Sequence, residues 1–404
     1  MDHGQQLFTL ALGLVPPWAV DDVRFMVEEK RLDLHVNFPR GSHFPWPICG
    51  QGFPVYDTLE KVWRNLDFFQ HAAYLHTRVS RVRCTEHGIH LVPVPWARKG
   101  SAFMLLFEAL VIAMVREMPV LTVARLIQET DQRLWRVIDH YVSKARKTVD
   151  MSDVHAIGVD ETSSRRGHHY ITLFVDLREK RLLFATPGKD AQTFAQFAED
   201  LQADGGCAPA ITEVSLDLSP AQKGAAEHLP HAEITFDRFH IMKLVIEAVD
   251  AVRKGEDLSQ PDLKKSRWLW LKNSGKVNAK QKAKLQDILK NQNLKTAQAH
   301  QYRLTFQEIF TLQNRHQGAT LLKACMENST ANGLPPLVKV AYTLMNHWDS
   351  LHLWFESQIT NGILEGFNNL LQTAKAKARG YRTHKNFINM AYLILGKLGR
   401  KLPI

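Results

Sequence analysis

Residues 155–188 read HAIGVDETSSRRGHHYITLFVDLREKRLLFATPG, and this stretch decides the fold class. It holds three apolar runs separated by short polar segments: HAIGVD (155–160), HHYITLFVDL (168–177) and RLLFATPG (181–188). Such runs are typical of strands joined by hairpins. A helical pattern, DAQTFAQFAEDLQ, then precedes two more strand-like runs, ITEVSLD (211–217) and AEITFD (232–237). We therefore expect an α/β fold built on a mixed five-stranded sheet, in the strand order of an RNase H-like core.

After this sheet the sequence changes to helical spacing. Residues 256–358 lack strand-like runs and are rich in lysine, which predicts a helical domain inserted into the core. NGILEGFNNLLQTAKAKARGY (361–381) supplies a further helix that returns to the sheet. Its predicted apolar face carries Phe367, Leu370 and Leu371, and its predicted polar face carries Glu365, Asn368, Asn369, Gln372, Lys375 and Arg379.

Before the sheet, residues 101–150 have helical spacing. VLTVARLIQE (120–129) and DQRLWRVIDHYV (131–142) are two short helical patterns separated by a tight turn, the lengths expected of a helix-turn-helix. A packed helical hairpin without DNA contacts is the alternative. If the pair binds DNA, Arg125, Arg133 and Arg136 are its candidate contacts.

The first 100 residues are expected to form a small β-rich unit. VDDVRFMVE (20–28) and RLDLHVNF (31–38) alternate apolar and polar residues around a polar turn, which predicts a hairpin. A metal knuckle follows, with Cys49, Cys84 and His87 as candidate Zn²⁺ ligands, whereas structural zinc needs four.

Trp46 stands three residues before Cys49, where a fourth ligand is expected, so His43 or His90 would have to replace it. The alternative to zinc is a knuckle held by packing of Trp46, Trp63 and Trp96. The expected domains are thus 1–100, the β unit; 101–150, the helix-turn-helix region; 151–255, the first part of the core; 256–358, the insertion; and 359–404, the final helix and basic tail.

Three acidic residues stand where strand ends and a helix would converge. Asp160 follows the apolar run 156–159, and Asp217 ends ITEVSLD. A buried carboxylate is costly without a cation, and two-metal phosphodiester chemistry needs carboxylates that hold Mg²⁺ or Mn²⁺. Glu365, at the start of the final helix, completes a candidate catalytic set with two metal ions.

A single Asp after a strand is more often a turn or cap residue, and Asp237 is a direct competitor of Asp217. We prefer Asp217, because its strand is expected to lie next to that of Asp160. Glu161, Asp237, His240 and Asn368 are candidate residues surrounding the three acids.

The net charge of +10 and pI near 9.3 favour a polyanionic partner. No acidic residue follows Glu365, whereas eight basic residues do. Among these, Lys375, Lys377, Arg379 and Arg382 are the candidate DNA contacts. The apolar stretch near the N-terminus is short, broken by Pro16 and Pro17, and lacks a basic flank, and the four cysteines lie far apart, so we expect a cytoplasmic protein.

Several motifs resemble the bacterial insertion-sequence transposases of the ISL-three type, within the DDE transposase superfamily. They are ICG (48–50), VYD (55–57), VWRNLD (62–67), RVRCTEHG (81–88), VPWA (94–97), IGVDE (157–161), LDLSPAQ (216–222), FDRFHIMKLVIEAVDAVRK (236–254), NGILEGFNN (361–369) and KAKARGYR (375–382). The resemblance implies Asp160, Asp217 and Glu365 as the catalytic triad. It also implies an N-terminal zinc finger and helix-turn-helix that recognise terminal inverted repeats in double-stranded DNA, and a homodimer or larger synaptic complex. The family usually has cysteine where this chain has Trp46.

Three other readings compete with a transposase. Another RNase H-like endonuclease would cut DNA without joining ends. A catalytically inactive DNA-binding derivative would bind DNA and ignore changes to the acids. A purely structural protein would leave the acids and the basic tail without a role.

Overall fold

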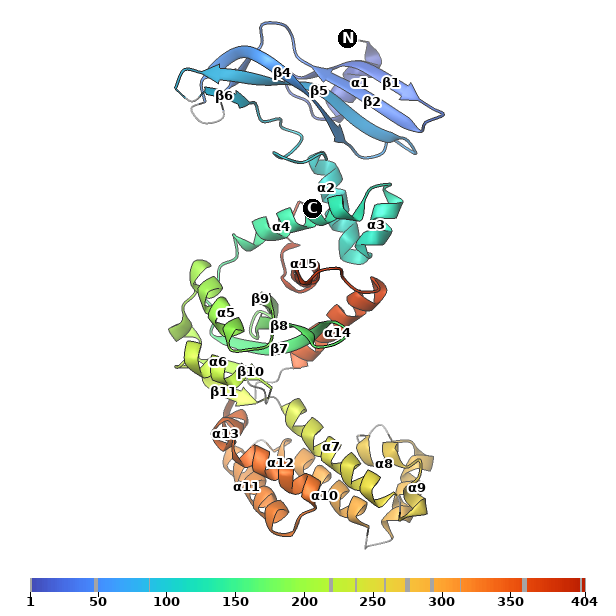
Figure 1. Cartoon of the computed structure of the whole chain (residues 1–404), viewed down its shortest axis with the longest axis vertical. Helices are drawn as coiled ribbons and strands as arrows, with labels where there is room; N and C mark the ends of the chain where they lie inside the picture. Colours follow the sequence, from blue (N-terminus) through green and yellow to red (C-terminus); the bar gives the residue numbers. More distant parts are fainter. Residues whose placement is uncertain are drawn as a thin grey trace. The chain divides into compact units, whose positions relative to one another are not determined.

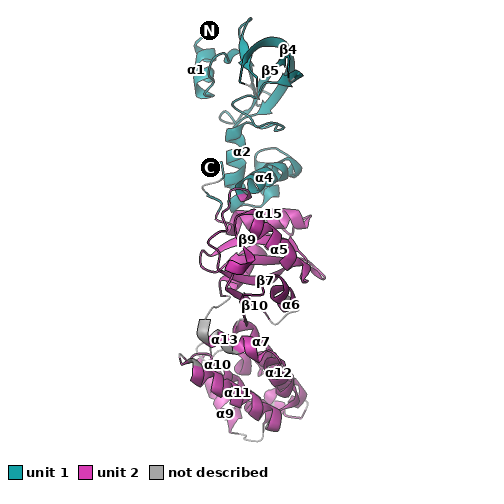
Figure 2. Ribbon diagram, turned by 90° about the vertical axis from the view of Figure 1, so that its left-hand side faces the viewer, with its two compact units in different colours: residues 1–145, 398–404 teal, residues 146–397 magenta. Residues whose placement is uncertain are grey.

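The computed structural model describes residues 2–46, 50–86, 88–217, 221–236, 238–257, 259–272, 277–290, 294–312, 314–357, 362–399 and 402–403. The chain divides into two compact units (Figure 2). One comprises Met1–Ala145 and Leu398–Ile404, and the other comprises Arg146–Lys397. In the part of the chain described, no helix combines the length and the apolar character needed to cross a membrane.

The first unit contains a sheet in the order β1-β2-β5-β4-β3, with β6 paired to β5 (Figure 1). Its elements are α1 (His3–Ala11), β1 (Ala19–Met26), β2 (Arg31–Asn37), β3 (His43–Pro45), β4 (Gly52–Arg64), β5 (Ala72–Cys84) and β6 (Gly88–Leu91). The predicted β1-β2 hairpin is confirmed. The long β4-β5 hairpin and the parallel pairing of β2 with β5 were not expected from the sequence.

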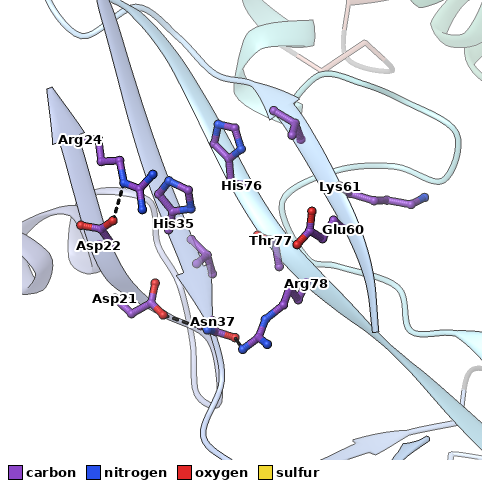
Figure 3. Close-up of a pocket in the computed structure, with 12 residues that line it drawn as sticks. Asp21, Asp22, Arg24, His35, Asn37, Glu60, Lys61, His76, Thr77 and Arg78 are labelled. Carbon is purple, nitrogen blue, oxygen red and sulfur yellow. Dashed lines mark hydrogen bonds and ion pairs between the residues drawn. The ribbon is translucent and has the colours of Figure 1, made fainter. Parts of the chain in front are cut away.

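The two faces of this sheet differ in chemistry. Leu32 and Leu34 of β2 are buried in the core, whereas alternate residues such as His35 reach the opposite face. On that face a pocket of about 340 Å³ is lined by residues of β1, β2, β4 and β5 (Figure 3). Asp22 pairs with Arg24 at 2.7 Å, and Asn37 accepts from Arg78 at 3.1 Å, so several of its polar groups satisfy one another.

Three helices follow the sheet of the first unit along the chain: α2 (Leu105–Glu117), α3 (Val120–Leu126) and α4 (Asp131–Arg146). α3 and α4 are the predicted helix pair. The fully buried carboxylate of Glu108 accepts hydrogen bonds from Arg98 at 2.9 Å, Ser101 at 2.6 Å and Tyr141 at 2.8 Å. This network joins the segment before α2 to α2 and α4.

The second unit is built on the mixed five-stranded sheet that the sequence predicts, in the order β11-β10-β7-β8-β9. Its strands are β7 (Ala156–Arg165), β8 (His169–Asp176), β9 (Arg181–Pro187), β10 (Glu213–Leu216) and β11 (Glu233–Phe236). β7, β8 and β9 form antiparallel hairpins, and β10 and β11 add in parallel on the other side of β7. α5 (Gln192–Ala203) and α6 (Ala221–His228) connect the strands.

Helices follow the sheet, as the sequence predicts (Figure 1). They are α7 (Arg238–Glu256), α8 (Arg267–Leu271), α9 (Ala279–Leu289), α10 (Lys295–Ile309), α11 (Arg315–Asn332), α12 (Pro335–Met345), α13 (Trp348–Ser357), α14 (Gly362–Lys377) and α15 (His384–Leu395). One buried apolar cluster runs from Val159 of β7 through Phe236 of β11 to Leu351 of α13. Apolar side chains of the helices therefore pack against the end of β11, next to the candidate site.

Candidate active site

Asp160 and Asp217 come from neighbouring parallel strands. β10 pairs with β7 in the register Val214 opposite Ile157 and Ser215 opposite Gly158. Two residues further on, the chains reach Asp217 and Asp160. Parallel strands in this register carry both carboxylates to the same level of the sheet.

His240 joins the two acids. One ligand atom from each of Asp160, Asp217 and His240 lies within 4.8 Å of the others, and all three side chains are half-buried. His240 lies in the first turn of α7, which begins directly after β11. Sequence reasoning placed His240 only around the acids, and the structure places it among them.

Hydrogen bonds to both carboxylate oxygens fix the orientation of Asp160. Its Oδ1 accepts from the backbone N–H of Glu161 at 2.7 Å, and its Oδ2 accepts from Asn368 Nδ2 at 2.7 Å. Asn368 Oδ1 is buried and makes no hydrogen bond to any described residue. The amide of Asn368 therefore fixes the direction of Asp160 and leaves an oxygen acceptor beside it.

The polar side of α14 lies along β7, as expected for a helix that presents Glu365 toward the metal site. Gln372 donates to Thr162 Oγ1 at 2.8 Å, and Lys375 donates to the Ser163 carbonyl at 2.5 Å. Of the residues on the predicted apolar face, Leu370 is 53% exposed, whereas Leu371 is buried. Residues spaced by three and four share a face of a helix, so the face that carries Asn368 lies along β7.

Negative charge is concentrated at this point of the sheet. Burial together with the nearby charges of Asp217 and Asp160 raises the pKa of Glu161 to about 7. Carboxylates that repel one another in a partly dry site favour a bound cation. Carboxylate oxygens suit Mg²⁺ and Mn²⁺, and an imidazole is a better ligand for softer metals. The donor set thus fits a divalent ion that is held mainly by carboxylate oxygens.

Glu365, the third predicted acid, lies apart from this group. Glu365 lies in the first turn of α14 and is exposed, and it does not belong to the group of close ligand atoms found in the described chain. It precedes Asn368 by three residues and therefore shares its side of the helix. Asp237, the competitor of Asp217, lies outside the described residues.

Comparison with known proteins covers most of the chain. An ISL3 family model described as a transposase matches residues 157–391. The chain belongs to the ISL3 family of transposases. The match begins in β7 and ends in α15, so it contains Asp160, Asp217, His240 and the whole of α14.

Other similarities agree with this assignment. The helix-turn-helix domain of transposase family ISL3 matches residues 92–142, which include α2, α3 and most of α4, so the predicted helix-turn-helix is confirmed. The transposase for insertion sequence element IS1557 of Mycobacterium tuberculosis is 25% identical over 98% of this chain and 97% of its own length. The transposase for IS1001 of Bordetella parapertussis is 26% identical over 82% of this chain and 84% of its own.

The basic residues predicted to contact DNA lie in different settings within this transposase. In the helix-turn-helix, Arg125 and Arg136 are exposed. Arg133 pairs with Glu129 at 2.5 Å and stacks 4.4 Å over the Phe103 ring, so its guanidinium is engaged within the fold. In the C-terminal region, Lys377, Arg379 and Arg382 are exposed, whereas Lys375 is held by Ser163.

The predicted zinc knuckle of the transposase is only partly described. Cys49 and His87 lie outside the described residues, and the side chain of Cys84 is buried. Across the described chain, Cys84, His43 and His90 do not gather into a metal-binding group. The three tryptophans are each at most 5% exposed, and Trp63 meets Trp96 edge to face at 5.9 Å. These contacts agree with the alternative in which aromatic packing holds the region.

Proposed function

We propose that this transposase cuts and joins DNA strands at the site formed by Asp160 and Asp217, with Glu365 as the third acid. The observation that carries the proposal is that ligand atoms of Asp160 in β7, Asp217 just after β10 and His240 in α7 lie within 4.8 Å of one another. The strand order β11-β10-β7-β8-β9, with three antiparallel strands followed by two parallel ones, supports an RNase H-like core.

Asp160 and Asp217 are the residues that hold divalent metal, Mg²⁺ or Mn²⁺, with His240 as a further ligand. When bound, two such ions activate the attacking oxygen and stabilise the leaving oxygen of a phosphodiester. Asn368 holds Asp160 in one orientation through its 2.7 Å hydrogen bond. Glu365, on the Asn368 side of α14, completes the carboxylate set when DNA is in place.

Recognition of DNA is assigned to the helix-turn-helix. The second helix of such a pair places its N-terminal residues against base edges in the major groove. Arg136 of α4 and Arg125 of α3 are exposed and supply the contacts. We assign the terminal inverted repeats of the element as the duplex bound here, by a homodimer or larger assembly that brings two ends together.

The test is cleavage of a labelled duplex that carries the element's terminal repeats, with Mg²⁺ or Mn²⁺. The variants are Asp160→Asn, Asp217→Asn, Asp237→Asn, Glu365→Gln and His240→Asn. We expect the wild type and Asp237→Asn to cut and join, because the strand before Asp237 is one place further from β7. The other three acid variants should lose both reactions while still binding the repeats, and His240→Asn should raise the metal concentration needed.

The competing functions give different results in the same assay. A wild-type protein that binds the repeats and never cuts them would be a DNA-binding derivative. Cutting without joining would indicate another nuclease of the same fold. Full activity of Asp217→Asn combined with loss in Asp237→Asn would transfer the second acid to β11.

A further inference from the structure

A basic groove lies at the far end of α14 from Glu365. It has a volume of about 800 Å³ and is formed by the end of β7, the turn that follows it, and the C-terminal end of α14. Its charged lining residues are Arg165, Arg166, Lys375, Arg379 and Arg382. None of its described lining residues is acidic. Five cations around one hollow create a positive potential that attracts a polyanion.

The walls of this groove are braced by its own residues. Arg165 donates to the main-chain carbonyl of Arg382, and Lys375 donates to the Ser163 carbonyl, so the strand end and the helix end are joined. The helix ends in a left-handed turn, with φ of 57° at Arg379 and 97° at Gly380, closed by a hydrogen bond of 2.8 Å from Gly380 N–H to the Lys375 carbonyl. Arg166, Arg379 and Arg382 remain exposed.

The pocket in the N-terminal sheet differs from this groove in the charge of its lining residues. That pocket is lined by Asp21, Asp22 and Glu60 as well as by basic residues (Figure 3). Acidic and basic groups in equal number give little net potential for a phosphate backbone. The groove of the second unit has the single-sign lining that phosphate binding needs.

The position of the groove relative to Asp160 follows from backbone geometry. Arg165 is five residues beyond Asp160 along β7, and Arg379 is eleven residues beyond Asn368 along α14. At roughly 3.3 Å per strand residue and 1.5 Å per helix residue, both paths measure about 16 Å. The rise of about 3.4 Å per nucleotide runs along the duplex axis while each strand winds around it, so a straight separation of about 16 Å corresponds to roughly two to three nucleotides of one strand.

We propose that this groove binds the DNA backbone roughly two to three nucleotides from the phosphodiester held at Asp160. Arg166, Arg379 and Arg382 contact the phosphates, and Arg165 and Lys375 keep the walls in place. The contact is independent of base sequence, since guanidinium groups on phosphate oxygens position a duplex without reading it. This inference rests on the proposed function for the identity of the scissile position.

The experiment uses the full-length Asp160→Asn protein, so that binding is measured without cutting. Its probes are terminal-repeat duplexes in which one phosphate at a time is replaced by an uncharged methylphosphonate. We expect the substitution roughly two to three nucleotides from the cleavage position to weaken binding. The same substitution should have no further effect when Arg166→Ala and Arg382→Ala are also present. The slope of log Kd against log salt should fall by about two in that double variant.

Arg178→Ala is the matched control. Arg178 is an exposed arginine in the turn between β8 and β9, at the opposite end of β8 from the groove, so its replacement removes a similar charge from the same sheet. It should leave the methylphosphonate pattern unchanged. Arg166→Gln with Arg382→Gln is the second variant, which keeps side-chain length if the alanine pair unfolds.

The outcomes separate this inference from the proposed function. An unchanged salt slope, or a uniform loss at every methylphosphonate position, overturns the groove assignment even if the wild type cuts DNA. If the coupling is specific to one position but the wild-type protein never cuts DNA, the groove assignment stands and the proposed catalysis is wrong. Coupling confined to the cleavage position itself, or to phosphates a half-turn or more away, overturns the spacing of roughly two to three nucleotides.

Discussion

Asn368 donates a hydrogen bond of 2.7 Å to Asp160 across 208 residues of sequence. This contact fixes α14 along β7 at the level of the acids and turns the carboxylate of Asp160. Partners that orient a metal-binding side chain typically contribute 10- to 100-fold to metal affinity or activity, as an order of magnitude. Asn368 is a positioning residue in this sense, because it acts through Asp160.

Asn368→Leu should therefore raise the metal concentration needed for cleavage by about 10- to 100-fold. Binding to the terminal repeats should stay as in the wild type, since the helix-turn-helix is untouched. The measurement is cleavage rate against Mn²⁺ concentration, with DNA affinity measured separately. Asn369→Ala is the control, because Asn369 is the exposed neighbour and should change neither quantity. Equal metal dependence of the Leu variant and the wild type would contradict the positioning role.

The buried carboxylate of Glu108 should be essential to the stability of the helix-turn-helix. Glu108→Ala leaves Arg98, Ser101 and Tyr141 without their acceptor and should lower the free energy of unfolding by about 3–5 kcal/mol, the usual effect of breaking a buried ion pair. Chemical denaturation of the full chain, followed by far-ultraviolet circular dichroism, measures this. Glu117→Ala, at the exposed end of α2, should change stability by less than about 0.5 kcal/mol. Similar losses in both variants would count against the network.

The central sheet was predictable because its signals are local. Hairpin strands such as β7 and β8 are short apolar runs separated by polar turns, and each can be seen within a few residues. β4 was missed because its thirteen residues carry polar side chains and Pro54 and are largely exposed. The parallel partnership of β2 and β5 joins segments that are distant in sequence, and no local pattern reports it.

The acidic residues of the site could be predicted from the sequence, whereas the residues that surround them were harder to predict. The apolar run before Asp160 marks a buried strand that ends in a charge, which is a local signal. The polar face of α14 was expected to meet the site through Glu365, whereas the contacts that the structure describes come from Asn368 and Gln372. His240 approaches Asp160 only after β11 is placed beside β10, although its motif FDRFH follows a strand directly and could have drawn attention.

A pH dependence of stability should arise at His300. This side chain is 6% exposed, and burial together with the charge of Arg303 lowers its pKa below 6.5. The unfolded state then binds a proton more readily than the folded state. Stability should be fully present above about pH 6.5 and should fall as the pH drops from there toward the folded pKa.

His300→Asn should reduce this dependence, because an amide can still donate to the Trp270 carbonyl, which His300 Nδ1 contacts at 3.1 Å, and does not titrate. The measurement is the thermal midpoint at several pH values, followed by fluorescence, to which the buried Trp270 contributes. His316→Asn, at an exposed position on α11, should keep the wild-type dependence. A loss of pH dependence in the His316 variant alone would refute the assignment to His300.

Gly224 should resist the replacement by alanine that usually stabilises a helix. Glycine within a helix is ordinarily less stable than alanine by roughly 0.5–1 kcal/mol. At Gly224 in α6, however, an added Cβ would lie 2.9 Å from Ala191 Cα and 3.0 Å from Phe194 Cδ2. Backbone at Ala191 cannot withdraw as a flexible side chain can, so Gly224→Ala should destabilise the second unit by about 1–3 kcal/mol.

Gly255→Ala in α7 is the matched comparison, since nothing lies within 4 Å of its added Cβ. It should raise the free energy of unfolding by about 0.5–1 kcal/mol, opposite in sign to Gly224→Ala. Chemical denaturation measures both, and stabilisation by both replacements would show that α5 and α6 are packed less closely than the structure has them. Because α6 lies between β10 and β11, shortly after Asp217, the Gly224 variant should also lose cleavage activity at temperatures where it remains folded.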